Sequence, residues 1–171
     1  MKDEEAAMRW DAFERACPEI ATMAAERFRR DDLVMVGTIR RDGSPRISPN
    51  EPDLAAGRLF VSMMWHSKKA LDLLRDPRIV VHSVTCERAG TDGDIKLYGR
   101  VVDERDNEVR EAFRDAIRAR IDWAPDEPSF HCFSVDIESA GYTRFSAEEE
   151  EAENRALAWD PERGLRELPL A

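Results

Sequence analysis

Hydrophobic positions change their spacing several times along the chain, and each spacing predicts a different element. Apolar side chains recur at helical intervals from Trp10 to Arg30, and Pro18 should divide this segment into two helices because proline fits only a first helical turn. A short helix is predicted over residues 67–75 and a longer amphipathic helix over residues 104–121. Strands are predicted over residues 33–40, 45–49, 58–65, 78–85, 94–103 and 130–137, the last of which continues into or pairs with 141–145.

The turns between these runs favour an antiparallel arrangement. Asp42-Gly43 is a strong hairpin signal, residues 53–57 indicate a turn, and residues 157–159 and 164–168 are expected to form a last hairpin. Six or seven strands with short turns, about three inserted helices and no regular βαβ alternation predict a mainly β fold with added helices (α+β), either a barrel or a sandwich. The unbroken run Ile79-Val80-Val81 predicts a strand buried on both faces.

The overall composition narrows the class of protein. A chain of 171 residues predicts one domain over residues 1–171, with a core at 8–145 and an acidic loop and tail at 146–171. The formal net charge of -10 argues against nucleic acid or an anionic membrane as the main partner, because both attract basic surfaces. Glu148–Glu151 and Glu153 form a like-charged run that we expect in a solvated loop. A charged amino end, and no apolar run near ~18 residues, predict a cytoplasmic location.

Residue types that carry metal or nucleophilic chemistry are sparse. Cys17, Cys86 and Cys132 are widely spaced, with no Cys-x-x-Cys motif and no His at zinc-ligand spacing. We therefore expect three buried reduced thiols and no metal site. Since no Ser-His-Asp order has supporting context, no catalytic side chain is predicted.

The segment Ser67-Lys68-Lys69 is the most informative feature of the chain. An apolar run stops at a serine that can cap a helix, and two lysines occupy the first turn of that helix. Lysines are unfavourable beside the unpaired N–H groups and partial positive charge of a helix N-terminus. A phosphate would reverse this balance, because backbone donors, helix dipole and ammonium groups would all attract it. The alternative is a pair of surface lysines on an ordinary helix.

Three motifs in a fixed order carry a resemblance to a known family. They are Arg41-Asp42-Gly43-Ser44-Pro45, Ser67-Lys68-Lys69 and Asp76-Pro77-Arg78. In this order and spacing, residues 8–145 resemble the pyridoxamine 5'-phosphate oxidase-like, FMN-binding split-barrel superfamily, and residues 159–168 do so more loosely. The resemblance implies a six-stranded antiparallel Greek-key split β-barrel. It also implies a homodimer with two flavins in grooves between the subunits.

The resemblance further implies which residues hold the cofactor. Arg46 would contact the phosphate with its fork of donors, and Lys68 and Lys69 would add positive charge. The alternative for Arg46 is a solvated strand residue that shares a face with Ser48, with Ile47 on the other face. The full predicted set comprises the phosphate residues, the strand along the isoalloxazine ring and the pair near the ribityl chain: Arg46, Ile47, Ser48, Pro49, Asn50, Ser62, Met63, Ser67, Lys68 and Lys69.

Departures from the family pattern argue against the vitamin B6 reaction as the activity of this chain. True pyridoxamine phosphate oxidases have a lysine five residues after the arginine, where this chain has Glu51, and they end in an Arg-Leu-His motif that is absent here. The leading hypothesis is a flavin-dependent oxidoreductase that transfers hydride between FMN and an unidentified small substrate. Alternatives are a reductase using the deazaflavin coenzyme F-420, a non-enzymatic flavin or haem binder with His66 or His82 as axial ligand, and a partner-binding dimer with a vestigial groove.

Overall fold

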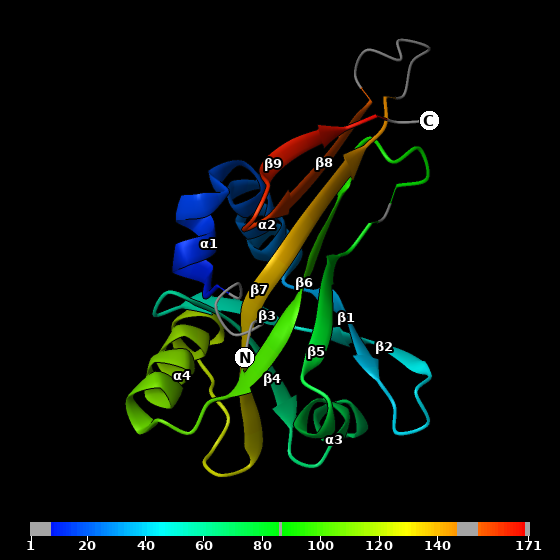
Figure 1. The fold of residues 1–171 in the computed structure, drawn as a ribbon. Coiled ribbons are helices and arrows are strands. Elements are labelled where there is room, and N and C mark those ends of the chain that lie inside the picture. The colour runs from blue at the N-terminus through cyan, green and yellow to red at the C-terminus, as the bar shows by residue number, and fades with distance from the viewer. Residues whose placement is uncertain (1–7, 86, 147–153, 170–171) are drawn as a thin grey trace.

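The computed structural model describes residues 8–85, 87–146 and 154–169, so Cys86 and the acidic run lie outside the described residues. The described elements are α1 (Trp10–Ala16), α2 (Pro18–Asp31), β1 (Val34–Ile39), β2 (Pro45–Asn50), β3 (Pro52–Ala55), β4 (Arg58–Met64), α3 (Lys68–Arg75), β5 (Arg78–Ser83), β6 (Asp94–Asp103), α4 (Asn107–Ile121), β7 (Phe130–Arg144), β8 (Arg155–Asp160) and β9 (Gly164–Leu168). Figure 1 shows their arrangement. None of the helices among these residues is long and apolar enough to cross a membrane.

The strands form one antiparallel sheet that curls into a split barrel. Its order is β2-β1-β5-β6-β7-β4-β3, and β8 and β9 extend it from β7. Although β2 and β3 lie at opposite ends of this order, a single residue, Glu51, joins them in the chain. The two ends of the sheet must therefore approach each other without pairing. The six predicted barrel strands correspond to β1, β2, β4, β5, β6 and β7, and the crossovers between non-consecutive neighbours are typical of a Greek key.

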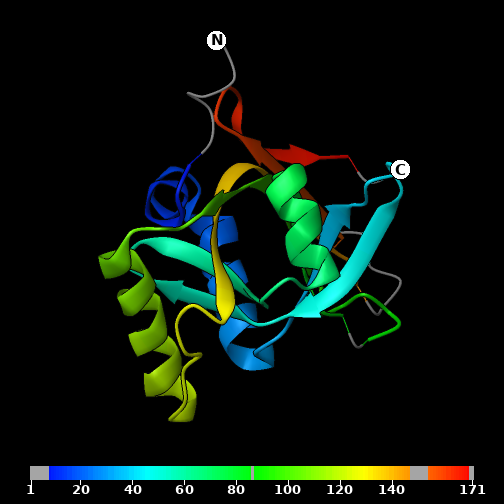
Figure 2. The same ribbon diagram turned by 90° about the horizontal axis from the view of Figure 1, so that it is seen from below.

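Helices close the ends of the curled sheet. α2 packs against β3, β5, β6 and β7, whereas α3 packs against β1 and β4. Figure 2 shows α3 lying across the lower opening of the sheet. Ala70 and Leu73 of α3 are buried in the same apolar core as Ile20 and Phe28 of α2. Because this core holds α3 on the barrel, it also fixes the position of the two lysines in the first turn of α3.

Most of the predicted elements are confirmed. The amino-terminal helices divide at Pro18, Gly43 has the positive φ of 84° that the Asp42-Gly43 hairpin requires, and the last hairpin forms from β8 and β9. The predicted helix over 104–121 begins at Asn107, because the carboxylate of Asp106 caps it by accepting from the N–H groups of Glu108 (2.9 Å) and Val109 (3.1 Å).

Two expectations need correction, and one open alternative is settled. Residues 53–57 are not only a turn, since β3 pairs with β4 over Pro52–Ala55. Of the two alternatives for residues 141–145, continuation of the strand is confirmed, because β7 runs from Phe130 to Arg144. Val80 is only partly buried, so β5 has one buried face in the single chain. The prediction of buried reduced thiols is confirmed for Cys17 and Cys132.

Candidate functional site

β2 presents alternate residues to α3, which confirms the predicted division of its faces. Arg46 and Ser48 are partly buried and Asn50 is buried, whereas Ile47 is 72% exposed on the opposite face. Two sets of polar contacts join this inner face of β2 to α3. One is made by Arg46 and the other by Lys69 of α3.

Arg46 is held by a carboxylate that sequence reasoning missed. Its Nε donates to Oδ2 of Asp72 at 2.6 Å, and the same oxygen accepts from Oγ1 of Thr38 at 3.1 Å. Asp72 and Thr38 are both buried, while the Arg46 side chain keeps 21% exposure. Burial raises the pKa of Asp72, but hydrogen bonds from Arg46 and Thr38 outweigh it, so the net pKa is lowered. The carboxylate thereby fixes one edge of the guanidinium.

Lys69 connects α3 to the end of β2. Its Nζ donates to the carbonyl oxygen of Pro49 and to Oδ1 of Asn50, each at 2.7 Å. Burial lowers the pKa of Lys69, and the nearby charge of Glu51 opposes part of this effect. A doubly charged anion beside this ammonium would oppose the effect of burial further, because opposite charge favours the protonated form.

The start of α3 has unsatisfied donors. Ser67 occupies the N-cap position, but its side chain makes no capping hydrogen bond, which corrects the expectation of a serine cap. Its Oγ is buried and has no hydrogen-bond partner among the described residues. The first turn contains no acidic side chain, and Lys68, which is exposed, follows the serine directly. A buried hydroxyl, free helix N–H groups and two lysines fit the chemistry of a phosphate.

A groove of about 600 Å³ lies beside Lys69. The predicted site residues on its wall are Pro49, Asn50, Ser62, Met63 and Lys69. Met63 is only 3% exposed and its side chain belongs to the core, so this residue can offer the groove little beyond its backbone. The remaining predicted residues do not line the groove: Arg46, Ile47, Ser48, Ser67 and Lys68.

The opposite wall of the groove was not predicted. It comes from α4 and from the segment that leads into β7, and its residues are Ile117, Trp123, Pro125, Asp126, Ser129 and Phe130. The amphipathic pattern of α4 indicates only a core-facing stripe, so the sequence contains no local signal that places this helix across the groove from β2.

Comparison with known proteins identifies the family. The family model described as pyridoxamine 5'-phosphate oxidase matches residues 21–144. This chain belongs to that family. No curated protein matches the sequence.

Solved structures share the fold at low sequence identity. An FMN-binding protein related to pyridoxamine 5'-phosphate oxidase from Nostoc punctiforme has a TM-score of 0.62 and 13% identity, over 88% of this chain and 94% of that one. A NimC/NimA family protein from Clostridium acetobutylicum has a TM-score of 0.62 and 18% identity, over 86% and 97%. A haem-binding protein from Mycobacterium smegmatis has a TM-score of 0.59 and 17% identity, over 81% of this chain and 58% of that one.

Glu51, the residue between β2 and β3, is paired with α4. Its Oε2 accepts from Nη2 of Arg120 at 3.1 Å, and Arg120 also pairs with Asp53 at 3.2 Å. Asp53 is buried, and burial raises its pKa although Arg120 opposes the effect. Arg120 of α4 therefore holds two acidic side chains, Glu51 and Asp53, at the start of β3.

The histidines and acidic residues show no metal-binding arrangement in the described part of the chain. No group of three or more His, Cys, Asp or Glu side chains there is placed to hold a metal ion. His82 is partly buried, with Nδ1 at 2.6 Å from the carbonyl oxygen of Ser83, whereas His66 is exposed. His131 is buried and stacks on Trp65 with ring centroids 4.4 Å apart.

Proposed function

We propose that this member of the pyridoxamine 5'-phosphate oxidase family binds FMN and acts as an oxidoreductase on a small organic substrate. The observation that carries the proposal is the start of α3, where the buried hydroxyl of Ser67 has no hydrogen-bond partner in the described part of the chain and two lysines occupy the turn that usually favours acidic residues. Lys69 has two neutral acceptors, Pro49 O and Asn50 Oδ1, but no anion bonded to it among the described residues. A phosphate monoester would satisfy the hydroxyl and balance the lysines.

Each residue of the proposed site has a distinct task. Asp72 accepts the hydrogen bond from Nε of Arg46, so the terminal nitrogens of the guanidinium would contact the phosphate. Lys68, Lys69, the Ser67 hydroxyl and the first N–H groups of α3 complete the phosphate contacts. The backbone of Ile47–Asn50 would lie along the ring, and Ser62 and Met63 would approach the ribityl chain.

When bound, FMN would supply the redox chemistry, and the protein would supply orientation and electrostatics. The wall formed by Trp123, Pro125 and Phe130 would exclude water from the groove. Glu51 and Asp126 on the groove wall would repel a phosphorylated substrate, which argues against the vitamin B6 reaction. The substrate is therefore expected to lack a phosphate.

The proposed functional unit is a homodimer. The outer faces of β1, β2, β5 and β6 form a shallow apolar surface with a hollow of about 870 Å³, whose residues include Met35, Ile47, Val80 and Tyr98. Ile47 is 72% and Tyr98 45% exposed. A second copy of this face would bury them, and it would also bury the outer side of β5, as its continuous apolar run predicts. Since Ile47 lies on the strand of the cofactor site, the groove would then lie at the subunit interface.

FMN titration of the purified protein tests this proposal. We expect saturable quenching of flavin fluorescence, and we expect Lys68→Ala combined with Lys69→Ala to weaken FMN binding at least about a hundredfold, because each charge-assisted hydrogen bond contributes about 1.5–3 kcal/mol. Arg118→Ala is the matched control, since it removes a cation that pairs with Glu111 and Asp115 on the exposed side of α4. FMN binding that is absent, or equal in the double variant and the wild type, would refute the proposal.

One observation favours the deazaflavin coenzyme F-420 as the second candidate. A hollow of about 480 Å³, lined by Arg40, Arg41 and Arg46 together with Asp42 and Asp72, has more arginines than aspartates and lies beyond the phosphate residues. This hollow suits a cofactor with an extended anionic tail. FMN and the deazaflavin have different visible bands, so the absorbance of the protein after each titration separates them. A haem binder would show a Soret band instead, and substitution of His66 would abolish it because His66 presents the most exposed imidazole.

A further inference from the structure

The turn between β4 and α3 has an unusual backbone for its sequence. The N–H of Ser67 donates to the carbonyl oxygen of Met64 at 3.0 Å, which closes a four-residue turn. His66, at the third position, has a φ of 55°. This left-handed conformation is typical of a type II turn and favours glycine or asparagine, not histidine. Another contact must therefore hold the backbone in this conformation.

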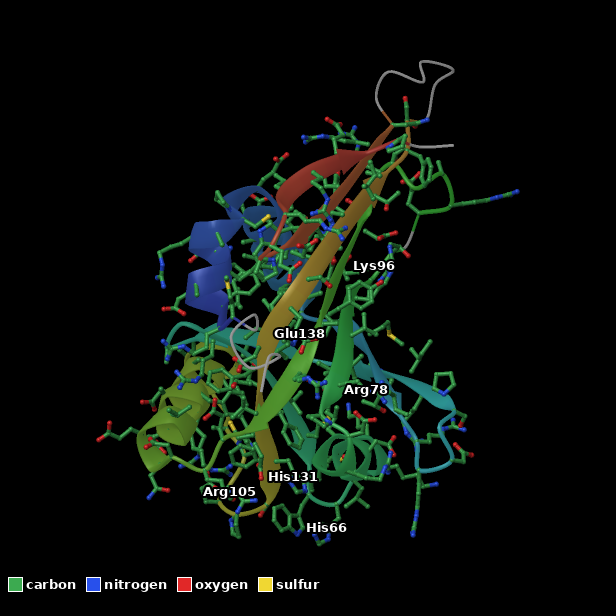
Figure 3. All side chains as sticks on the ribbon, in the orientation of Figure 1. His66, Arg78, Lys96, Arg105, His131 and Glu138 are labelled. Carbon is green, nitrogen blue, oxygen red and sulfur yellow. The ribbon has the colours of Figure 1, made fainter. Side chains whose placement is uncertain are left out.

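His131 supplies that contact from the neighbouring strand. Its Nε2 accepts a hydrogen bond from the backbone N–H of His66 at 3.2 Å. The turn itself leaves this N–H free, because its own closing bond uses the N–H of Ser67. His131 lies opposite Met63 in the pairing of β7 with β4, so its ring reaches just past the end of β4. Figure 3 shows the two histidines together at the lower end of the barrel.

Packing fixes the ring of His131 in the orientation that this hydrogen bond needs. The ring is stacked on Trp65 at 4.4 Å with an interplanar angle of 10°, and on Phe133 at 5.7 Å with an angle of 8°. His131 is only 6% exposed. Burial lowers its pKa, and Asp103 opposes this effect. The imidazole is therefore neutral at neutral pH, with Nε2 available as an acceptor.

We propose that His131 is a positioning residue for the cofactor phosphate. It holds the turn at His66, and the turn sets where Ser67 and the two following lysines stand at the start of α3. This inference rests on the proposed FMN site, because the segment that His131 positions is the segment assigned to the phosphate. The side chain of His131 contacts Trp65, His66 and Phe133, so it acts on the phosphate residues through the turn.

Two substitutions of His131 separate its hydrogen bond from its packing. His131→Phe keeps a planar ring against Trp65 but removes the acceptor, and it should weaken FMN binding about tenfold, since the N–H of His66 is left without a partner. His131→Gln places an amide oxygen near the position of Nε2 and should restore most of the affinity. Ser134→Ala is the control: it removes a buried side-chain hydrogen bond from the same strand, to Glu104 at 2.5 Å, without touching the turn. It should reduce stability and leave FMN affinity unchanged.

Amide hydrogen exchange over residues 64–67 provides a readout that does not require FMN. Exchange in the absence of FMN should accelerate at least about tenfold in His131→Phe and return toward the wild-type rate in His131→Gln. Equal affinity and equal exchange in wild type and His131→Phe would overturn the inference. If the wild-type protein binds no FMN but His131→Phe still accelerates exchange, the FMN site is overturned and the role of His131 in the turn is supported.

Discussion

Asp72→Ala tests whether the ion pair between α3 and β2 organises the proposed phosphate site. Asp72 is 6% exposed in its side chain and accepts from Nε of Arg46 at 2.6 Å and from Oγ1 of Thr38 at 3.1 Å. Nη1 of Arg75 lies 3.5 Å from the other carboxylate oxygen. The substitution removes the hydrogen-bond acceptor of Arg46 and Thr38 and the ion-pair partner of Arg75 at once.

The expected cost follows from what the substitution leaves behind. Thr38 is 3% exposed, so its hydroxyl would lose its partner inside the protein, and Arg46 would keep a guanidinium that is only 21% exposed. Removal of one partner from a buried, hydrogen-bonded ion pair costs about 3–5 kcal/mol. For a domain of this size each kcal/mol corresponds to about 2–4 °C in melting temperature. We therefore expect a decrease in Tm of about 10 °C, together with weaker FMN binding, because Arg46 would no longer be oriented.

Urea unfolding at neutral pH measures the change in the free energy of unfolding. Asp115→Ala is the control, because Asp115 pairs with Arg118 at 2.5 Å on the exposed face of α4, where such a pair contributes about 1 kcal/mol or less. A loss of less than about 1 kcal/mol for Asp72→Ala would refute the argument. It would mean that Arg46 and Thr38 find new partners without cost.

The difference in the free energy of unfolding between wild type and Asp72→Ala should also depend on pH. The pKa of Asp72 is lower in the folded protein than its ordinary value. Its contribution to stability is therefore fully present above the unfolded pKa, near about 3.9, and is lost as the pH falls through the folded pKa. The stability gap between wild type and Asp72→Ala should narrow below about pH 4 and remain constant from about pH 5 to 7.

Four further predictions concern the core and the proposed interface. Gly99→Ala should destabilise the protein by about 3 kcal/mol in urea unfolding, because a Cβ there would lie 2.0 Å from the carbonyl oxygen of Asp136 at the bulge between β6 and β7. Trp159→Ala should cost about 3–5 kcal/mol in the same assay, since it removes the edge contact with the buried ring of Phe13 at 5.0 Å. The thiol of Cys132 should resist labelling at pH 8 until the protein unfolds, because burial raises its pKa to about 12. Tyr98→Glu should shift the mass measured by light scattering from dimer to monomer, and a wild-type protein that is already monomeric would contradict the proposed interface.

The elements that the sequence predicts well are those whose signals are local. Pro18 divides α1 from α2, and the Asp42-Gly43 pair places the first hairpin, because proline and glycine constrain the backbone wherever they stand. β3 was missed for a related reason: Pro52 and Asp53 weaken its strand pattern, and only pairing with the adjacent β4 makes it a strand. Its pairing is set by tertiary context and not by composition.

The residues of the proposed site also fall into those that local motifs predict and those that only the fold reveals. Arg46 and Lys69 could be predicted because each lies in a motif with neighbours that resemble a family. Asp72, which fixes Arg46, and His131, which fixes the turn before α3, lie 26 and 65 residues from the groups they hold. Nothing in their own neighbourhoods distinguishes them from an ordinary helix carboxylate and an ordinary strand histidine. Only the fold brings such partners together.

These supporting contacts also bear on selectivity for the proposed ligand. Arg46, Lys68 and Lys69 carry three positive charges, and Asp72 removes one of them while orienting Arg46. The remaining two positive charges match a phosphate monoester, which carries about −1.5 to −2 near neutral pH. Three cations without a nearby carboxylate would attract any polyanion. A fixed guanidinium edge and a single buried hydroxyl bind preferentially a compact group with several acceptor oxygens. Asp72→Ala should therefore relax discrimination between FMN and unrelated anions as well as weaken FMN binding, and competition by inorganic pyrophosphate measures that change.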